Sequence, residues 1–346
     1  MILNAYAVLD LALSAARLLL ALLIVALAVR AWRYRRSPPA LDARQAVEDR
    51  TYLLSLLGLL LLALNVLAWP LFYLLLASYV AQWPGVMCIY GVTRIGSGTS
   101  GATRFLPDLL TALEVGKPVL LFAGGAWLVL YLANRATQTA PLAQRVLAAL
   151  IVLSVAGGAD AACESAYLLI PKRAPSLSAG CCTTAFDDPA TAGWFLADPV
   201  LSAADRPELT TGYIALNGAM VLALTAALTW PRLRRRAALA LLLIAALPVL
   251  AVSAAFLVDV VAPCVLHLPY HHCPYDLIPM VPETVLAVAL FWWGTCCVGW
   301  AYVAARWGDS AESRPWLSQS LPVLLRLARF GYLASLVMIA VELAVA

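Results

Sequence analysis

The chain has 346 residues, of which 63% are hydrophobic and 12% are charged, and its formal net charge is +4. Soluble proteins average about 25% charged residues and need a mixed surface, which long apolar runs cannot supply. The composition excludes a soluble enzyme and a nucleic-acid-binding protein. It predicts an all-α, polytopic integral membrane protein whose first partner is the lipid bilayer.

Eight apolar runs are long enough to cross a bilayer, since a spanning helix needs about 20 residues. In chain order, the predicted spans cover residues 9–29, 52–80, 109–132, 146–170, 211–230, 237–262, 284–305 and 321–345. The longer connections on one side are 81–108, 171–210 and 263–283. We expect residues 1–346 to form a single transmembrane domain.

Charge asymmetry predicts the orientation of these spans. Sixteen of the 23 Lys and Arg residues follow the odd-numbered spans, whereas only five of the 19 acidic residues lie there. Basic loops are retained in the cytoplasm, so both termini and the three longer loops should be exoplasmic. The first run is no cleavable signal peptide, because its basic cluster follows the apolar stretch. A composition of the GC-rich type favours a bacterial inner membrane.

The second to seventh spans form three consecutive hairpins, each with a cysteine-bearing outer loop. Cys88, Cys182 and Cys273 are 94 and 91 residues apart. Each loop ends in proline and an acid: Pro107-Asp108, Pro207-Glu208 and Pro282-Glu283. Proline suits a first helical position, and a carboxylate there meets the positive end of the helix dipole. The pattern suggests a three-fold hairpin repeat. The alternative is that each helix start acquired its proline and acid independently.

Six of the eight cysteines lie in or near the outer loops, and are candidates for disulfides in an oxidising compartment. They are Cys88, Cys163, Cys181, Cys182, Cys264 and Cys273. Six cysteines allow 15 pairings, of which Cys264 with Cys273 is one. The absence of a Cys-x-x-Cys motif counts against a thiol–disulfide oxidoreductase.

All three histidines of the chain fall within one outer loop, between the cysteines Cys264 and Cys273. His267, His271 and His272 bring the loop to five nitrogen or sulfur donors in ten residues. Imidazole and thiolate ligands suit zinc or copper. The loop therefore predicts a metal site, and the alternative is a set of solvated histidines beside a disulfide.

Ionisable residues within membrane spans are costly and mark functional sites by default. Seven occur here: Arg17, Glu114, Lys117, Asp160, Glu164, Asp259 and Glu342. Glu114 and Lys117 share a helix face, as do Asp160 and Glu164. We expect a polar cavity that opens outward, and interfacial ion pairs are the alternative. Two further cysteines, Cys296 and Cys297, lie among small residues and predict close helix packing.

The leading functional hypothesis is the handling of a metal ion, copper or zinc, or of redox equivalents at the outer face. A second is a non-catalytic subunit, whose disulfide-bonded loops dock a membrane or periplasmic partner in a transporter or respiratory complex. A third is a cation-coupled transporter of small solutes. No nucleotide-binding loop, haem-attachment motif or catalytic residue is evident.

Overall fold

The computed structural model is helical, with no strand in the residues that it describes. These are 4–36, 41–82, 86, 88–93, 95, 101–172, 207–268, 271 and 273–346, with the backbone alone over 34–36 and 41–50. Eight helices in this part of the chain are long and apolar enough to cross a membrane. The predicted class of multi-pass, all-helical membrane protein is therefore confirmed.

Each predicted span coincides with a long helix. The helices are α1 (Ala5–Arg36), α2 (Leu41–Val80), α4 (Leu106–Arg135), α5 (Ala143–Leu169), α7 (Pro207–Thr229), α8 (Arg236–Phe256), α11 (Pro282–Trp307) and α12 (Arg314–Val345). A π-helical turn (Leu257–Val261) and the short α9 (Ala262–Val265) extend α8. The short α3 (Ile89–Thr93) and α10 (Leu277–Met280) lie in two of the connections.

Proline and an acid begin three of these helices, as the sequence indicates. Asp108 lies in the first turn of α4, Glu208 in that of α7 and Glu283 in that of α11. In all three helices proline occupies one of the first two positions, where no intrahelical N–H is needed. These local signals set the helix boundaries.

The chain divides into two compact units. Unit 1 comprises Met1–Pro84, Val92–Ala179 and Ser310–Arg314, and unit 2 comprises Gly85–Gly91, Gly180–Asp309 and Pro315–Ala346. The expected single domain thus contains two sets of four long helices. The helices of the predicted middle hairpin, α5 and α7, belong to different units, and the three-fold repeat stays a prediction.

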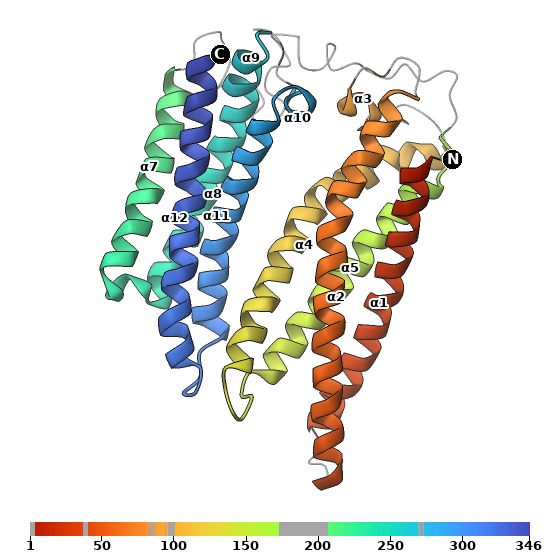
Figure 1. Cartoon of the computed structure of the whole chain (residues 1–346), viewed down its shortest axis with the longest axis vertical. Helices are drawn as coiled ribbons and strands as arrows, with labels where there is room; N and C mark the ends of the chain where they lie inside the picture. The colour runs from red at the N-terminus through yellow and green to blue at the C-terminus, as the bar shows by residue number, and fades with distance from the viewer. Residues whose placement is uncertain are drawn as a thin grey trace. The chain divides into compact units, whose positions relative to one another are not determined.

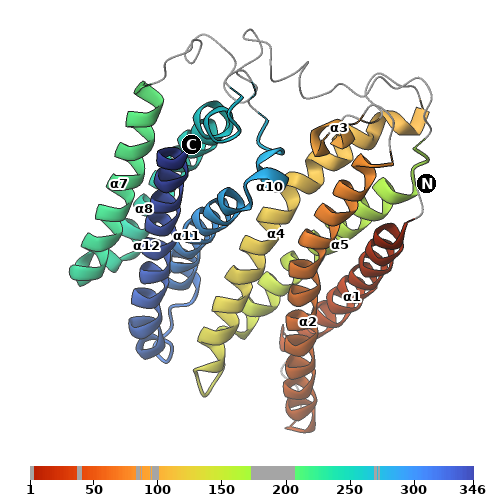
Figure 2. The same cartoon turned by 45° about the horizontal axis from the view of Figure 1, so that its top comes forward.

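Unit 1 is built around α5, against which α1 and α4 pack, while α2 packs on α1 (Figures 1 and 2). Its core includes the fully buried Trp127 of α4. A Cβ atom at Gly58 of α2 would lie 2.7 Å from that indole ring, so the small residue permits close packing. Beyond the helix ends, Glu312 accepts hydrogen bonds from the backbone N–H groups of Gln138 and Thr139.

Unit 2 contains α7, α8, α11 and α12 (Figure 1). The rings of Tyr213 and Phe256 stack at 4.1 Å between α7 and α8. Helices α11 and α12 cross at two glycines: a Cβ atom at Gly331 would lie 2.6 Å from the carbonyl oxygen of Leu290, and one at Gly294 would lie 3.0 Å from that of Ala328. Gly294 is one of the small residues near Cys296 that were predicted to permit close packing, and its partner Gly331 was not predicted.

The two ends of the unit 2 helices differ in chemistry. The α7–α8 connection is basic and contains Arg232, Arg234, Arg235 and Arg236. Arg234 Nε donates to the carbonyl oxygen of Ala227 at 2.9 Å, and Arg236 pairs with Asp309. Cys264 of α9, and His267, His271 and Cys273 of the α9–α10 connection, follow the opposite end of α8. Basic residues thus gather at one end of these helices, and this asymmetry is the basis on which we predict the orientation in the membrane.

Candidate functional sites

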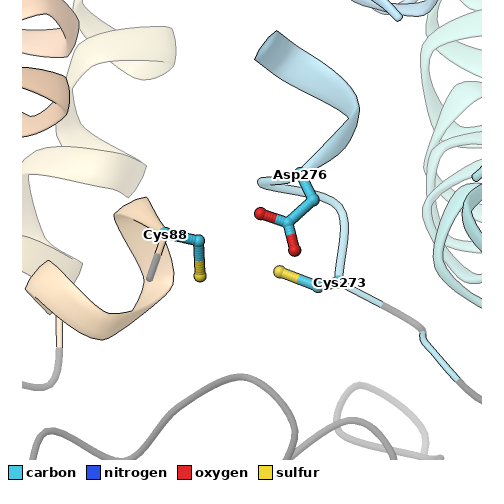
Figure 3. A group of neighbouring side chains, drawn as sticks. All are labelled: Cys88, Cys273 and Asp276. Atoms are coloured by element: carbon cyan, nitrogen blue, oxygen red, sulfur yellow. The ribbon is translucent and has the colours of Figure 1, made fainter. Parts of the chain in front are cut away.

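Two cysteines and an aspartate of unit 2 form a cluster that we call the thiol–carboxylate cluster. The Sγ atoms of Cys88 and Cys273 and a carboxylate oxygen of Asp276 all lie within 4.8 Å of one another. Their side chains point toward one another from two chain segments (Figure 3). The cysteines are 185 residues apart in sequence, so tertiary packing creates the cluster.

Short turns position these three side chains. Cys88 directly precedes α3, while Cys273 and Asp276 occupy the turn before α10, where the Asp276 N–H lies 3.4 Å from the Cys273 carbonyl oxygen. The rings of Tyr90 and Tyr275 lie 6.1 Å apart beside the cysteines. Both thiols are buried, so aromatic side chains shield the cluster from solvent.

His271 contacts the carboxylate of the thiol–carboxylate cluster. Its Nε2 atom lies 2.7 Å from Asp276 Oδ2, and its ring is buried. A histidine that holds a carboxylate in this way fixes the direction of the remaining carboxylate lone pairs. The arrangement therefore offers three convergent ligand atoms and an orienting group.

Two other residues of the predicted metal site, His267 and Cys264, are not part of this cluster. His267 is exposed and has a left-handed backbone with φ of 54°, and Cys264 is exposed. His272 lies outside the described residues. Among the described residues, the structure thus brings Cys273 and His271 together with Cys88 and Asp276. Cys88 was predicted only as a disulfide candidate, and Asp276 was missed because no local spacing ties it to Cys88.

No disulfide joins the described cysteines. They are Cys88, Cys163, Cys264, Cys273, Cys296 and Cys297. A hydrogen bond with Cys88, together with burial, raises the pKa of the Cys273 thiol well above its ordinary value. Cys181 and Cys182 lie outside the described residues, and the disulfides stay a prediction. Cys296 and Cys297 are buried in α11, as expected for packing residues.

A second polar site lies inside unit 1, where four predicted intramembrane charges meet. We call Arg17, Lys117, Asp160 and Glu164 the ionic network. Arg17 Nη1 donates to Glu164 Oε2 at 2.7 Å, and its Nη2 atom pairs with Asp160. Lys117 Nζ lies 3.0 Å from Glu164 Oε2 and 3.3 Å from Asp160 Oδ2. All four side chains are buried. Their ion pairs connect the membrane-spanning helices α1, α4 and α5.

Two polar residues complete the network. Asn65 of α2 accepts a hydrogen bond from Arg17 Nε at 2.8 Å. Asp10 of α1 is fully buried and interacts with Glu164. We missed Asp10 because it lies at the edge of the predicted first span. The signal was its position seven residues before Arg17, which places both on one face of a helix.

The remaining predicted polar residues lie outside the network. Glu114 is exposed, although it shares α4 with Lys117. Asp259 lies in the π-helical turn of unit 2, and Glu342 lies near the end of α12. The intrahelical pair Asp160 and Glu164 faces one site, as predicted, whereas Glu114 and Lys117 diverge.

Just beyond α5, Lys172 covers one end of the unit 1 bundle. Its Nζ atom donates to the carbonyl oxygen of Tyr167 at 2.6 Å and lies 4.2 Å from the centroid of that ring. Burial lowers the pKa of Lys172 to about 8, because desolvation disfavours the ammonium form.

Comparison of the chain with protein-family models, with curated proteins and with solved structures gave no match. The geometry and chemistry of the two sites therefore carry the information about function.

Proposed function

We propose that this membrane protein handles a soft or borderline metal ion, zinc or copper(I), at its exoplasmic face. The observation that carries the proposal is the convergence of Cys88, Cys273 and Asp276, with ligand atoms within 4.8 Å of one another. Two thiolates suit both metals, while the carboxylate favours zinc. Three protein ligands leave a fourth tetrahedral position for water or an incoming ligand.

The separation of the ligand atoms supports a metal of this size. In a tetrahedral zinc site with Zn–S bonds of about 2.3 Å, two thiolates lie about 3.8 Å apart. Cys88 and Cys273 are within 4.8 Å, so small side-chain rotations would bring both sulfurs to one ion. His271 would act through Asp276 rather than as a direct ligand, since its Nε2 atom already contacts that carboxylate.

The exoplasmic location is part of the proposal. It depends on the basic α7–α8 connection of unit 2, which precedes α8, whereas Cys273 and Asp276 of the thiol–carboxylate cluster follow α8. Cys264 is exposed and lies in α9, which follows α8 on the same side as Cys273 in chain order. Labelling of Cys264 in intact cells by an impermeant maleimide is expected, and labelling only after lysis would contradict this orientation.

Dithiol oxidation is a second candidate function, favoured by the close approach of the two sulfur atoms. Oxidation would break two S–H bonds, form one S–S bond and deliver two electrons and two protons to a quinone or a disulfide-bearing protein. A disulfide between the two cysteines does not involve Asp276, whereas the proposed metal site needs its carboxylate as the third ligand. Asp276→Asn therefore separates the two candidates, because only metal binding should be lost.

Titration calorimetry on the reduced, full-length protein in detergent tests the metal proposal. We expect one Zn²⁺ or Cu⁺ to bind per chain, and Cys88→Ser, Cys273→Ser and Asp276→Asn each to weaken binding at least 100-fold. Cys264→Ser is the matched control, since this cysteine lies in the same connection but outside the cluster. Equal affinities in all four variants and the wild type would refute the site.

A further inference from the structure

We infer that the ionic network of unit 1 binds one exchangeable proton, held between Asp10 and Glu164. The inference concerns residues of unit 1 alone and is independent of the metal proposal. It begins with the charges that the fold gathers in one place. The network contains two cations, Arg17 and Lys117, and with Asp10 it contains three carboxyl groups.

The hydrogen bonds show which carboxyl groups the cations neutralise. Arg17 and Lys117 both contact Asp160 Oδ2, and both contact Glu164 Oε2. The two cations therefore balance the charges of these two carboxylates. Neither cation forms an ion pair with Asp10 in the described network, so the third carboxyl has no matching positive charge.

Buried oxygen atoms without partners locate the missing proton. Both oxygens of Asp10 lack a hydrogen-bond donor, and so do Glu164 Oε1 and Asp160 Oδ1. Asp10 and Glu164 are both fully buried and lie within hydrogen-bonding reach of each other. A proton on Asp10 would donate to Glu164 Oε1 and would satisfy an orphaned atom on each residue.

An ionised Asp10 would be strongly disfavoured at this position. Two adjacent carboxylates without solvent repel each other, and such pairs share a proton in other buried sites. Burial of an unpaired charge adds a large desolvation cost. One bound proton makes the group of five side chains electrically neutral, which is the form that a membrane interior favours.

Other titratable groups surround this pair on each packed helix. Tyr79 of α2 faces Asp10, and Tyr167 of α5 lies beside Tyr79. The hydroxyls of both tyrosines are buried without a hydrogen-bond partner. Lys172 lies against both rings, and the exposed Glu114 of α4 is near Tyr167. Tyr79 and Tyr167 thus lie between the proton site at Asp10 and Lys172 at the end of the bundle.

Infrared spectroscopy of the reconstituted full-length protein tests the inference. At neutral pH the wild type is expected to show a protonated-carboxyl C=O band from a buried group, which shifts in D₂O. Asp10→Asn leaves two cations and two carboxylates, so the band should disappear. Glu164→Gln should remove it for the same reason, and serves as the second variant if Asp10→Asn does not fold.

Two further variants make the proton count quantitative. Lys117→Met leaves one cation with three carboxyl groups, so the band should roughly double. Glu114→Gln alters an exposed carboxylate on the same helix and should leave the band unchanged. A wild-type spectrum without a protonated-carboxyl band would overturn the inference, as would an undiminished band in both Asp10→Asn and Glu164→Gln.

Discussion

The two polar sites of this protein are assembled in opposite ways. The ionic network of unit 1 is carried by long helices and combines residues at regular helical spacing, such as Asp160 and Glu164. The thiol–carboxylate cluster of unit 2 is carried by turns, and its cysteines come from connections that are far apart in sequence. The network can therefore stabilise helix packing, whereas the packing of the long helices does not depend on the cluster.

This difference has an energetic consequence. Removing one member of a buried ion pair leaves an uncompensated charge and costs about 3–5 kcal/mol. Removing a ligand from a turn leaves the helix packing intact and changes affinity rather than stability. Variants in unit 1 should therefore affect folding most, and variants at the cluster should affect metal binding.

Arg17→Met is expected to have the largest effect on stability. It leaves Asp160 and Glu164 buried with a single cation, so the free energy of unfolding should fall by about 3–5 kcal/mol. Denaturant unfolding in mixed micelles measures the change, and Glu114→Gln, an exposed site on α4, should shift the free energy of unfolding by less than about 0.5 kcal/mol. A loss below about 1 kcal/mol for Arg17→Met would contradict the role of the network.

At the cluster, His271→Ala should weaken zinc binding by about 10- to 100-fold, because the orienting contact to Asp276 is lost. His267→Ala is the matched control, since His267 is exposed in the same connection. Calorimetric titration of both variants gives the comparison. If His267→Ala is the more damaging change, the histidines bind the metal by another arrangement.

Helix packing in unit 2 provides a contrast that involves no charge. Gly331→Ala should destabilise the protein by about 1–3 kcal/mol, because its Cβ atom would lie 2.6 Å from the carbonyl oxygen of Leu290. Gly218→Ala in α7 meets no atom within 4 Å and should be neutral or stabilising. Thermal unfolding of the two variants should give opposite signs, and equal losses would argue against close packing at Gly331.

A smaller effect is expected from Lys172, whose pKa burial lowers to about 8. Between that value and the ordinary lysine pKa, the unfolded chain binds more protons than the folded one, so stability rises with pH. From pH 7 to 9 the gain should be about 1 kcal/mol. Thermal unfolding at several pH values should show this rise in the wild type and a flatter profile in Lys172→Met.

Sequence patterns predicted the parts of the molecule that local chemistry determines. Apolar runs located the eight long helices of the described residues, and proline with an acid marked where α4, α7 and α11 begin. Helical spacing placed Asp160 and Glu164 at one site. The same reasoning failed for Glu114, because three-residue spacing to Lys117 does not fix which side chain turns toward the bundle.

The thiol–carboxylate cluster was only partly predictable. Clustering of histidines and cysteines drew attention to the segment that contains His271 and Cys273. The partnership of Cys273 with Cys88 depends on tertiary packing across 185 residues, and sequence cannot choose among cysteine pairings. The division into two sets of four helices also escaped prediction, since loop spacing grouped the spans into hairpins.

X-ray absorption spectroscopy of the reduced, zinc-loaded protein tests the metal proposal most directly, because it counts the ligand atoms around the ion. The account predicts two sulfur ligands at about 2.3 Å and two lighter ligands at about 2.0–2.2 Å. The Cys88→Ser variant should retain at most one sulfur ligand. A zinc ion surrounded only by nitrogen and oxygen would contradict the assignment of Cys88 and Cys273 as ligands.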